Sequence, residues 1–334
     1  MNYRDVKIIF MGTPEFAVTS LEKLVDAGCN IVAVITAPDK AAGRGMQLQQ
    51  SAVKKYALEK DINILQPNKL KDPEFLQLLR SLHADIQVVV AFRMLPEIVW
   101  NMPPLGTINL HGSLLPDYRG AAPINWAIIN GEKFTGVTTF KLKQEIDTGD
   151  ILLKEKIPIA NDETAGELHD KMKVIGADLL LKTILGIADN TLTGIPQTSN
   201  PKPQTSNPKP QTSNSHPQTS NLKPLHHAAK IFTENCMIDW NRPVEDVYNL
   251  VRGLSPVPAS FTTLEKKKLK IYKGGKIIGK PSIEPGIIDT DGKNYLRFAC
   301  IDGYIDILDL QLEGKKRMEV KDFLRGYRFG VDAK

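Results

Sequence analysis

Apolar residues in the first 190 positions follow two patterns, short continuous runs and longer stretches with helical spacing. The runs VKIIFMG, IVAVI and IQVVVAF are apolar at nearly every position, as in strands that are buried on both faces of a sheet. The stretches FAVTSLEKLVDAG and FLQLLRSLH place apolar residues three or four positions apart, as amphipathic helices do. This alternation predicts an α/β fold with a doubly wound, mainly parallel sheet.

The pattern stops between Ile195 and Pro224, where QTSN occurs four times with a period of seven residues. Proline removes backbone donors and blocks helix, and Thr, Ser and Asn give the chain nothing apolar to bury. The tract therefore predicts an extended, mobile connection with polyproline character. We expect three parts: a first domain at 1–190, a flexible linker at 191–225 and a second domain at 226–330.

Beyond the tract, the apolar pattern changes from helical spacing to a period of two. PVEDVYNLVRGL still has one apolar helical face, but KKLKIYKG, YLRFACIDG and YIDILDLQLEG alternate between apolar and polar residues and end at glycines. Several short strands joined by glycine turns are typical of a small β-barrel. The C-terminal part is thus expected to be a β-barrel domain.

The apolar runs, cysteines and histidines indicate the cellular compartment and the metal content of the protein. No apolar run approaches the roughly 20 residues that span a bilayer, and the N-terminus lacks the features of a signal peptide. Cys29, Cys236 and Cys300 are odd in number and scattered, and none has zinc-type spacing with a histidine. His226 and His227 form the only local histidine pair and are expected to lie in a flexible loop. These features predict a cytoplasmic protein without a bound metal.

The positive charge is unevenly distributed. The net charge is +5, and the whole excess lies in residues 222–334. A basic C-terminal domain suggests a polyanionic partner, although a solvated surface face explains the charge equally well.

The first loop excludes one common function of such folds. MGTPEFA follows the first strand but has a single glycine where dinucleotide binding needs GxGxxG. Glu15 would also repel a pyrophosphate at the start of the next helix. A hydride-transfer enzyme is therefore disfavoured.

The stretch INLHGSLLPDYRG ends a predicted strand with two polar side chains, Asn109 and His111, which project from one face because they are two positions apart. Asp147 lies in IDTGD, a polar turn between two predicted strands. An amide and an imidazole can stabilise an oxyanion, and a carboxylate can help to move a proton off an attacking amine. Because no GxSxG motif is present, the residues favour direct acyl transfer. Ordinary structural roles for all three residues remain the alternative.

The run NLHGSLLPDYRGAAPINWAI resembles the active-site signature of the formyltransferases that depend on 10-formyltetrahydrofolate. The similarity extends to MGTPEFA, PDKAAGRG and LEGKKRMEVKDFLRG, which match the members that act on methionyl initiator tRNA. The resemblance implies a Rossmann-like formyltransferase catalytic domain at 1–190 and a tRNA-binding, OB-like β-barrel domain at 226–330. It also implies that Asn109, His111 and Asp147 are the catalytic groups.

The same resemblance implies where the folate co-substrate lies. In this family it runs along the segment after the catalytic histidine and reaches the loop after VVVAF. The corresponding residues are Ser113, Leu114, Leu115, Pro116 and Phe92. A cis peptide bond before Pro116 is compatible with this arrangement. No metal is implied.

Two further features suit a tRNA partner. In this family a glycine-flanked loop enters the acceptor end of the tRNA through an arginine, which corresponds to Arg44. Many relatives have lysines after GRG, whereas Met46 and Gln47 stand here, which predicts a weaker salt dependence for the loop. Phosphate contacts are expected from Lys266, Lys267, Lys268, Lys315, Lys316 and Arg317. The partners are then methionyl initiator tRNA and folate, with no membrane, and the chain is expected to be a monomer.

Three other functions are compatible with parts of this pattern. A small amine could replace tRNA as acceptor, although the basic C-terminal domain and the GRG loop argue against it. The chain could be a non-catalytic RNA-binding protein, against which the intact Asn, His and Asp speak. Water could be the acceptor, which would give formyl hydrolysis without any amine.

Overall fold

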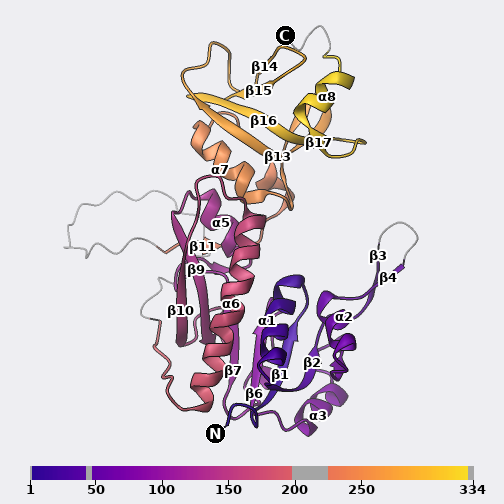
Figure 1. Ribbon diagram of the computed structural model, residues 1–334, viewed down its shortest axis with the longest axis vertical. Helices are drawn as coiled ribbons and strands as arrows, with labels where there is room; N and C mark the ends of the chain where they lie inside the picture. Colours follow the sequence, from indigo (N-terminus) through magenta and orange to yellow (C-terminus); the bar gives the residue numbers. More distant parts are fainter. Residues whose placement is uncertain (1, 43–46, 198–224, 330–334) are drawn as a thin grey trace, which may run out of the picture.

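The computed structural model describes residues 2–42, 47–197 and 225–329. Figure 1 shows two units stacked along the long axis, with the N-terminal unit in the lower part of the view and the C-terminal unit above it. Each unit has its own sheet and its own cluster of buried apolar side chains.

The N-terminal unit contains a seven-stranded sheet, and the expected doubly wound arrangement is confirmed. In spatial order its strands are β10 (Ile151–Pro158), β9 (Phe134–Lys141), β7 (Thr107–His111), β6 (Ile86–Val90), β1 (Lys7–Gly12), β2 (Asn30–Ile35) and β5 (Ile64–Leu65). The helices are α1 (Glu15–Asp26), α2 (Ala52–Glu59), α3 (Pro73–Ser81), α4 (Glu97–Trp100), α5 (Pro123–Ile129) and α6 (Ala165–Ala188). The strands from β7 to β5 pair in parallel, whereas β9 is antiparallel to β7 and to β10.

Strand β1 shows how the two faces of this sheet are covered. Ile8 and Phe10 pack into a cluster with side chains of α1, α2, α5 and α6, whereas Ile9 and Met11 pack on the other face with side chains of α3 and α4. Successive residues of a strand point to opposite faces, so an apolar run such as KIIFMG needs helices on both sides. Figure 1 shows α6 lying along β9 and β10.

The C-terminal unit is a curled antiparallel sheet of the expected OB-like kind. Its strand order is β12 (Ser260–Leu264), β13 (Lys267–Ile278), β16 (Gly303–Leu312), β15 (Leu296–Ala299) and β14 (Ile288–Thr290), and β17 (Met318–Glu319) pairs with β16. The predicted helix is α7 (Val244–Leu254), and a one-turn 3-10 helix, η1 (Thr233–Cys236), precedes it. A second helix, α8 (Val320–Gly326), was not expected, because seven residues are too few to show a helical period.

Helix α7 packs against both units. Val247 and Val251 belong to the C-terminal core, whereas Gly253 and Arg252 face the N-terminal unit. The carbonyl of Gly253 accepts a hydrogen bond from Asn125 Nδ2 of α5 at 2.7 Å, and Arg252 donates to the carbonyl of Glu163 at 3.0 Å. The two units are therefore docked through buried contacts.

Two short strand pairs complete the description. β3 (Lys40–Ala42) and β4 (Gln47–Gln49) form a hairpin, where the sequence suggested only a loop, and β8 (Arg119–Gly120) pairs with β11 (His227–Ala228). Arg44, Met46 and the tract 198–224 lie outside the described residues, as does the side chain of Gln47. Among the described helices, none is long and apolar enough to cross a membrane.

Candidate functional site

A cavity of about 820 Å³ opens at the carboxyl ends of β6 and β7. Ligands of doubly wound folds bind at this edge of the sheet. Its wall brings together Asn109, His111, Asp147 and Phe92 from the sequence prediction. The segment after the repeat tract also reaches the cavity, with the residues His227, Ala228, Ala229 and Lys230.

The register of β7 explains why Asn109 and His111 share this wall. Ile108 and Leu110 point into the cluster beneath α6, so the two polar residues between and after them project from the opposite face. Asn109 lies between Val89 of β6 and Phe140 of β9. The predicted pair is thus brought together at the end of one strand.

Asp147 completes the group from the turn between β9 and β10. The Nδ1 atom of His111 lies 3.7 Å from Oδ2 of Asp147, and both side chains are about nine-tenths buried, with exposed fractions of 8% and 11%. The other ring nitrogen, Nε2, lies 2.9 Å from the carbonyl oxygen of Tyr118. Because a carbonyl only accepts, Nε2 is a donor, and Nδ1 carries a proton only when the ring is an imidazolium. At 3.7 Å, Nδ1 is not committed to a hydrogen bond with Asp147.

Three residues around the cavity adopt left-handed backbone conformations without being glycine. They are Ala91 (φ 47°), Tyr118 (φ 56°) and Asp147 (φ 53°). Such conformations are uncommon, cost free energy and cluster at functional sites. Ala91 and Asp147 lie on the cavity wall, and Tyr118 is two residues before Gly120 on that wall, so strained backbone adjoins the cavity.

The predicted folate residues are divided by the structure. Phe92 lines the cavity, but Ser113, Leu114, Leu115 and Pro116 are not among the residues of its wall. Ser113 and Leu115 are fully buried, and Ser113 Oγ donates to the carbonyl of Asp117 at 2.6 Å. The peptide bond before Pro116 is cis. Gly112 lies on the cavity wall, whereas the next four residues, 113–116, do not.

Sequence reasoning missed a polar group behind Asp147. Arg119 is only 6% exposed, and its guanidinium donates to Oε1 of Gln197 at 3.1 Å from Nε. Burial lowers the pKa of Arg119, and the carboxylates of Asp147 and Glu145 oppose this shift. Gln197 belongs to the first QTSN copy, and nothing in a repeated polar motif marks one glutamine as different from the next.

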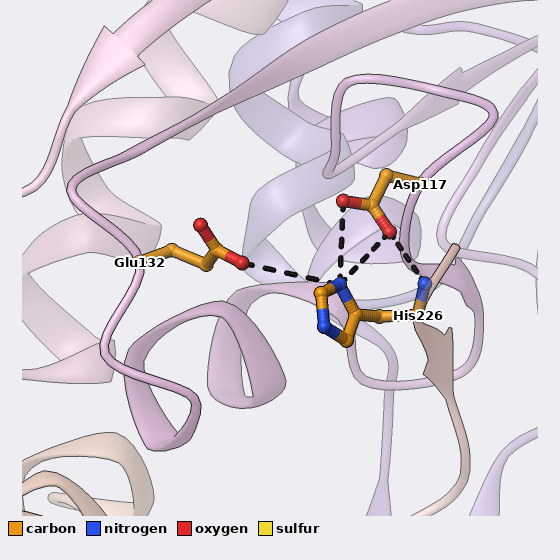
Figure 2. Close-up of side chains that lie close together, drawn as sticks. All are labelled: Asp117, Glu132 and His226. Carbon is orange, nitrogen blue, oxygen red and sulfur yellow. Dashed lines mark hydrogen bonds and ion pairs between the residues drawn. The ribbon is translucent and has the colours of Figure 1, made fainter. Parts of the chain in front are cut away.

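A second missed group involves His226, which was expected to be a loop residue. Figure 2 shows its ring between the carboxylates of Asp117 and Glu132. Nδ1 lies 3.2 Å from Oδ1 of Asp117 and 3.9 Å from Oε1 of Glu132. In the part of the chain that the structure describes, these are the only clustered His, Cys, Asp or Glu side chains that could hold a metal ion. His226 and Asp117 also satisfy each other directly, because Nδ1 can donate to the carboxylate.

The predicted phosphate contacts lie on two adjacent turns of the C-terminal unit. Glu313 N donates to the carbonyl of Lys268 at 2.8 Å, which places the turn before β13 beside the turn after β16. All six predicted side chains are exposed, and so are Glu265 and Glu313 on the same turns. The six are Lys266, Lys267, Lys268, Lys315, Lys316 and Arg317. Arg317 is already paired with Asp309, which raises the pKa of its guanidinium, and it lies over the ring of Tyr272.

Comparison with known protein families gives two matches. Residues 6–184 match a family described as formyl transferase, and residues 230–328 match the formyl transferase C-terminal domain. Together the two matches leave out mainly the repeat tract and its flanks.

Named relatives resemble the chain over almost its whole length. Proteins called methionyl-tRNA formyltransferase are 51% identical in Phocaeicola vulgatus, covering 98% of both chains, and 49% identical in Bacteroides fragilis, covering 98% of this chain and 97% of the relative. Among solved structures, an N-formyltransferase from Helicobacter canadensis, in complex with folinic acid and dTDP-3-aminofucose, aligns with a TM-score of 0.61 at 20% identity. That alignment covers 94% of this chain and 100% of the other, and it supports the fold.

Proposed function

The chain belongs to the formyl transferase family, and from this premise we propose that it transfers the formyl group of 10-formyltetrahydrofolate to the α-amino group of methionyl initiator tRNA. The observation that carries the proposal is the meeting of Asn109, His111 and Asp147 on one cavity wall. The relatives with about 50% identity that carry the name methionyl-tRNA formyltransferase support this acceptor. We infer that the enzyme is monomeric, since all three side chains come from one chain, and that it is cytoplasmic, since its three cysteines are free.

The cavity suits a folate. Its volume of about 820 Å³ lies within the ~300–1,000 Å³ of ordinary ligand sites. The aromatic and aliphatic side chains of Phe92, Leu95 and Trp100 give it an apolar side on which a pterin ring can pack. The bound folate would supply an activated formyl group, and we propose that this group is placed against Asn109 and His111.

The three side chains can divide the chemistry between them. The amide of Asn109 and the Nδ1–H of a His111 imidazolium can donate to the oxygen on which negative charge builds. The Asp147 carboxylate can accept the proton that the attacking amine loses, directly or through water, and can return it to N10 of the folate as the bond between N10 and the formyl carbon breaks and tetrahydrofolate leaves. The hydrogen bond from Gly120 N to Asp147 Oδ2, 3.0 Å long, holds that carboxylate in place.

We also propose a separate function for each part of the chain. We propose that residues 1–190 carry the chemistry, that 191–225 connect, and that 226–330 bind tRNA through the two basic turns. Arg44 is proposed as the contact of the β3–β4 hairpin with the acceptor end. A guanidinium is suited to this because it pairs with phosphate and stacks on bases.

An acceptor assay tests the proposal. Formyl transfer by the intact chain is measured with charged initiator tRNA, with small amines such as a nucleotide-linked amino sugar, and with water alone. We expect turnover only with the charged tRNA. Formylation of free amines, or formyl release without an amine, would contradict the proposal.

Variants of the three side chains test the mechanism. Asn109→Ala and His111→Ala each remove a donor to the developing charge and should lower kcat by about 100- to 1,000-fold. Asp147→Asn should lower kcat by about 100- to 10,000-fold, since it removes the proton acceptor. Circular dichroism checks that each variant is folded, and near-normal rates in all three would exclude this mechanism.

A further inference from the structure

We propose that Gln197 and His226, on the two sides of the repeat tract, are positioning residues of the active site. Gln197 holds the turn that carries Asp147. His226 holds the loop in which the carbonyl of Tyr118 accepts a hydrogen bond from His111. This inference rests on the proposed function. It assigns a role in the reaction to one residue of the predicted linker and to the first residue of the predicted second domain.

Gln197 uses its whole amide group on the catalytic turn. Nε2 donates to the carbonyls of Asp147 at 2.9 Å and of Gly149 at 2.8 Å. Oε1 accepts from the guanidinium of the buried Arg119. Since Asp147 has a left-handed backbone, its conformation depends on such external contacts. An amide is the group that fits, because the two carbonyls need a donor and Arg119 needs an acceptor.

His226 holds the other side of the site through both backbone and ring. Its N–H donates to Oδ1 of Asp117 at 2.7 Å, and its carbonyl accepts from Tyr118 N at 2.9 Å. Its ring stacks on the ring of Tyr118, with centroids 4.9 Å apart, and its Nδ1 faces Asp117 (Figure 2). The carbonyl of Tyr118 is the partner of His111 Nε2. One residue thus separates the His226 contacts from the catalytic imidazole.

The two contacts meet on the segment 117–120. His226 binds Asp117 and Tyr118, and Gln197 binds Arg119. Gly120, the next residue, donates to the Asp147 carboxylate, and a Cβ on Gly120 would lie 2.4 Å from the carbonyl of Ala228. The segment is therefore packed between the catalytic turn and the chain that follows the tract. It sets the distance between His111 and Asp147.

It follows that the two sides of the tract contact neighbouring residues, Tyr118 and Arg119. The chain leaves the catalytic unit and returns to it at nearly the same place. The contacts of Gln197 and His226, and not the number of repeats, are then what the reaction requires.

The experiment first establishes that the intact wild-type chain formylates charged initiator tRNA. If it does not, the proposed function fails before any variant is made. The variants are Gln197→Ala, Gln197→Glu, His226→Ala and His226→Asn, with Gln77→Ala and His83→Asn as matched controls at exposed positions that are not on the cavity wall. Steady-state kcat and KM for charged tRNA are measured for each, and thermal melting checks folding.

We expect kcat to fall by up to about 100-fold in Gln197→Ala, with KM changed less than about twofold, since a small misplacement of reacting groups costs this much. Gln197→Glu keeps the acceptor for Arg119 but loses both donors, so it should be as slow as Gln197→Ala. His226→Asn, whose side-chain amide can still donate to Asp117, should recover part of the loss seen in His226→Ala. Both controls should match the wild type.

A shortened chain distinguishes the effect of the Gln197 and His226 contacts from the effect of the length of the repeat tract. Deletion of residues 204–217 removes two of the four QTSN copies and should leave kcat and KM within about twofold of wild type. Folded Gln197 and His226 variants with normal kcat, or an effect confined to KM, would overturn the inference. It would also be overturned if a chelator inactivated the wild type, zinc restored it, and His226→Ala responded to neither, because the Asp117–Glu132–His226 cluster would then be a metal site.

Discussion

At the scale of single residues, burial controls the chemistry of the three thiols. Cys29, Cys236 and Cys300 are all free and buried. Burial raises the pKa of Cys29 from 9.0 to about 11 and that of Cys300 to about 12. The thiolate is the reactive form of cysteine, so both groups should be inert at neutral pH.

These thiols make a prediction about pH. The folded chain keeps their protons after the unfolded chain has lost them, so their stabilising contribution is complete below pH 9 and is lost as the pH rises towards 11. We expect the free energy of unfolding in urea to fall over this range, and to fall less in Cys29→Ser. At pH 8 a thiol reagent should label the chain only in denaturant. Fast labelling of the folded chain would contradict the prediction.

The residue scale also shows what the sequence could reveal about the site. Asn109 and His111 could be predicted because a strand has a period of two, and Asp147 because a family signature marks it. Gln197 and His226 could not, since their contacts span 50 and 109 positions and depend on how the chain returns to the sheet. The folate contacts expected along 113–116 stay a prediction, and within that segment Ser113 and Leu115 are fully buried.

At the scale of elements, helix α6 begins with a capping box. Thr164 Oγ1 accepts from Glu167 N, and Glu167 Oε2 accepts from Thr164 N at 2.8 Å. The latter bond is the main reason why the pKa of Glu167 is lowered from 4.5. A lowered carboxyl pKa stabilises the fold above pH 4.5, and this contribution is lost as the pH falls.

Thr164→Ala keeps this backbone bond but removes the cap and the hydrogen bond that Thr164 Oγ1 donates to Glu167 Oε2 at 2.7 Å, which also lowers the pKa of Glu167. It should lower the free energy of unfolding by about 1 kcal/mol at pH 7, as for other N-caps, and by less at pH 3, where Glu167 is protonated. Urea denaturation at the two pH values measures this. Thr263→Ala, at an exposed strand position, serves as control and should cost less than half as much. An equal cost at both pH values would show that Glu167 does not take part.

The helices that could be read from the sequence have either a long apolar period or a clear cap, such as Asp72 before α3. The elements that were missed are short. Strands β3 and β4 have three residues each and α4 has four, so no period can appear.

At the scale of the molecule, α7 makes the two units depend on each other. A Cβ on Gly253 would lie 2.6 Å from Cγ1 and 3.1 Å from N of Ile129 in α5, so the units approach closely only because this residue is glycine. A period-based reading of α7 found its apolar face but could not show that its other face is also buried.

Gly253→Ala should weaken this docking by about 1–3 kcal/mol, as overpacked contacts do. We expect the wild type to unfold in a single calorimetric transition and Gly253→Ala to broaden or divide it. The kcat/KM for charged tRNA should also fall, because the basic turns lose their fixed position. Gly326→Ala, where no atom lies within 4 Å of the added Cβ, is the control. An unchanged transition would indicate that the backbone of α5 moves aside at little cost.

Gln197 and His226 contact the neighbouring residues Arg119 and Tyr118, so the repeat tract begins and ends close to one place. This has a consequence for how the number of repeats changes between generations. Tandem coding repeats gain and lose units when a polymerase slips, and each slip here would add or remove seven residues in frame. Because Gln197 and His226 are held at neighbouring residues, a change in the number of residues between them should cost little entropy. Copy number should therefore differ between closely related strains, with catalysis intact in each of them.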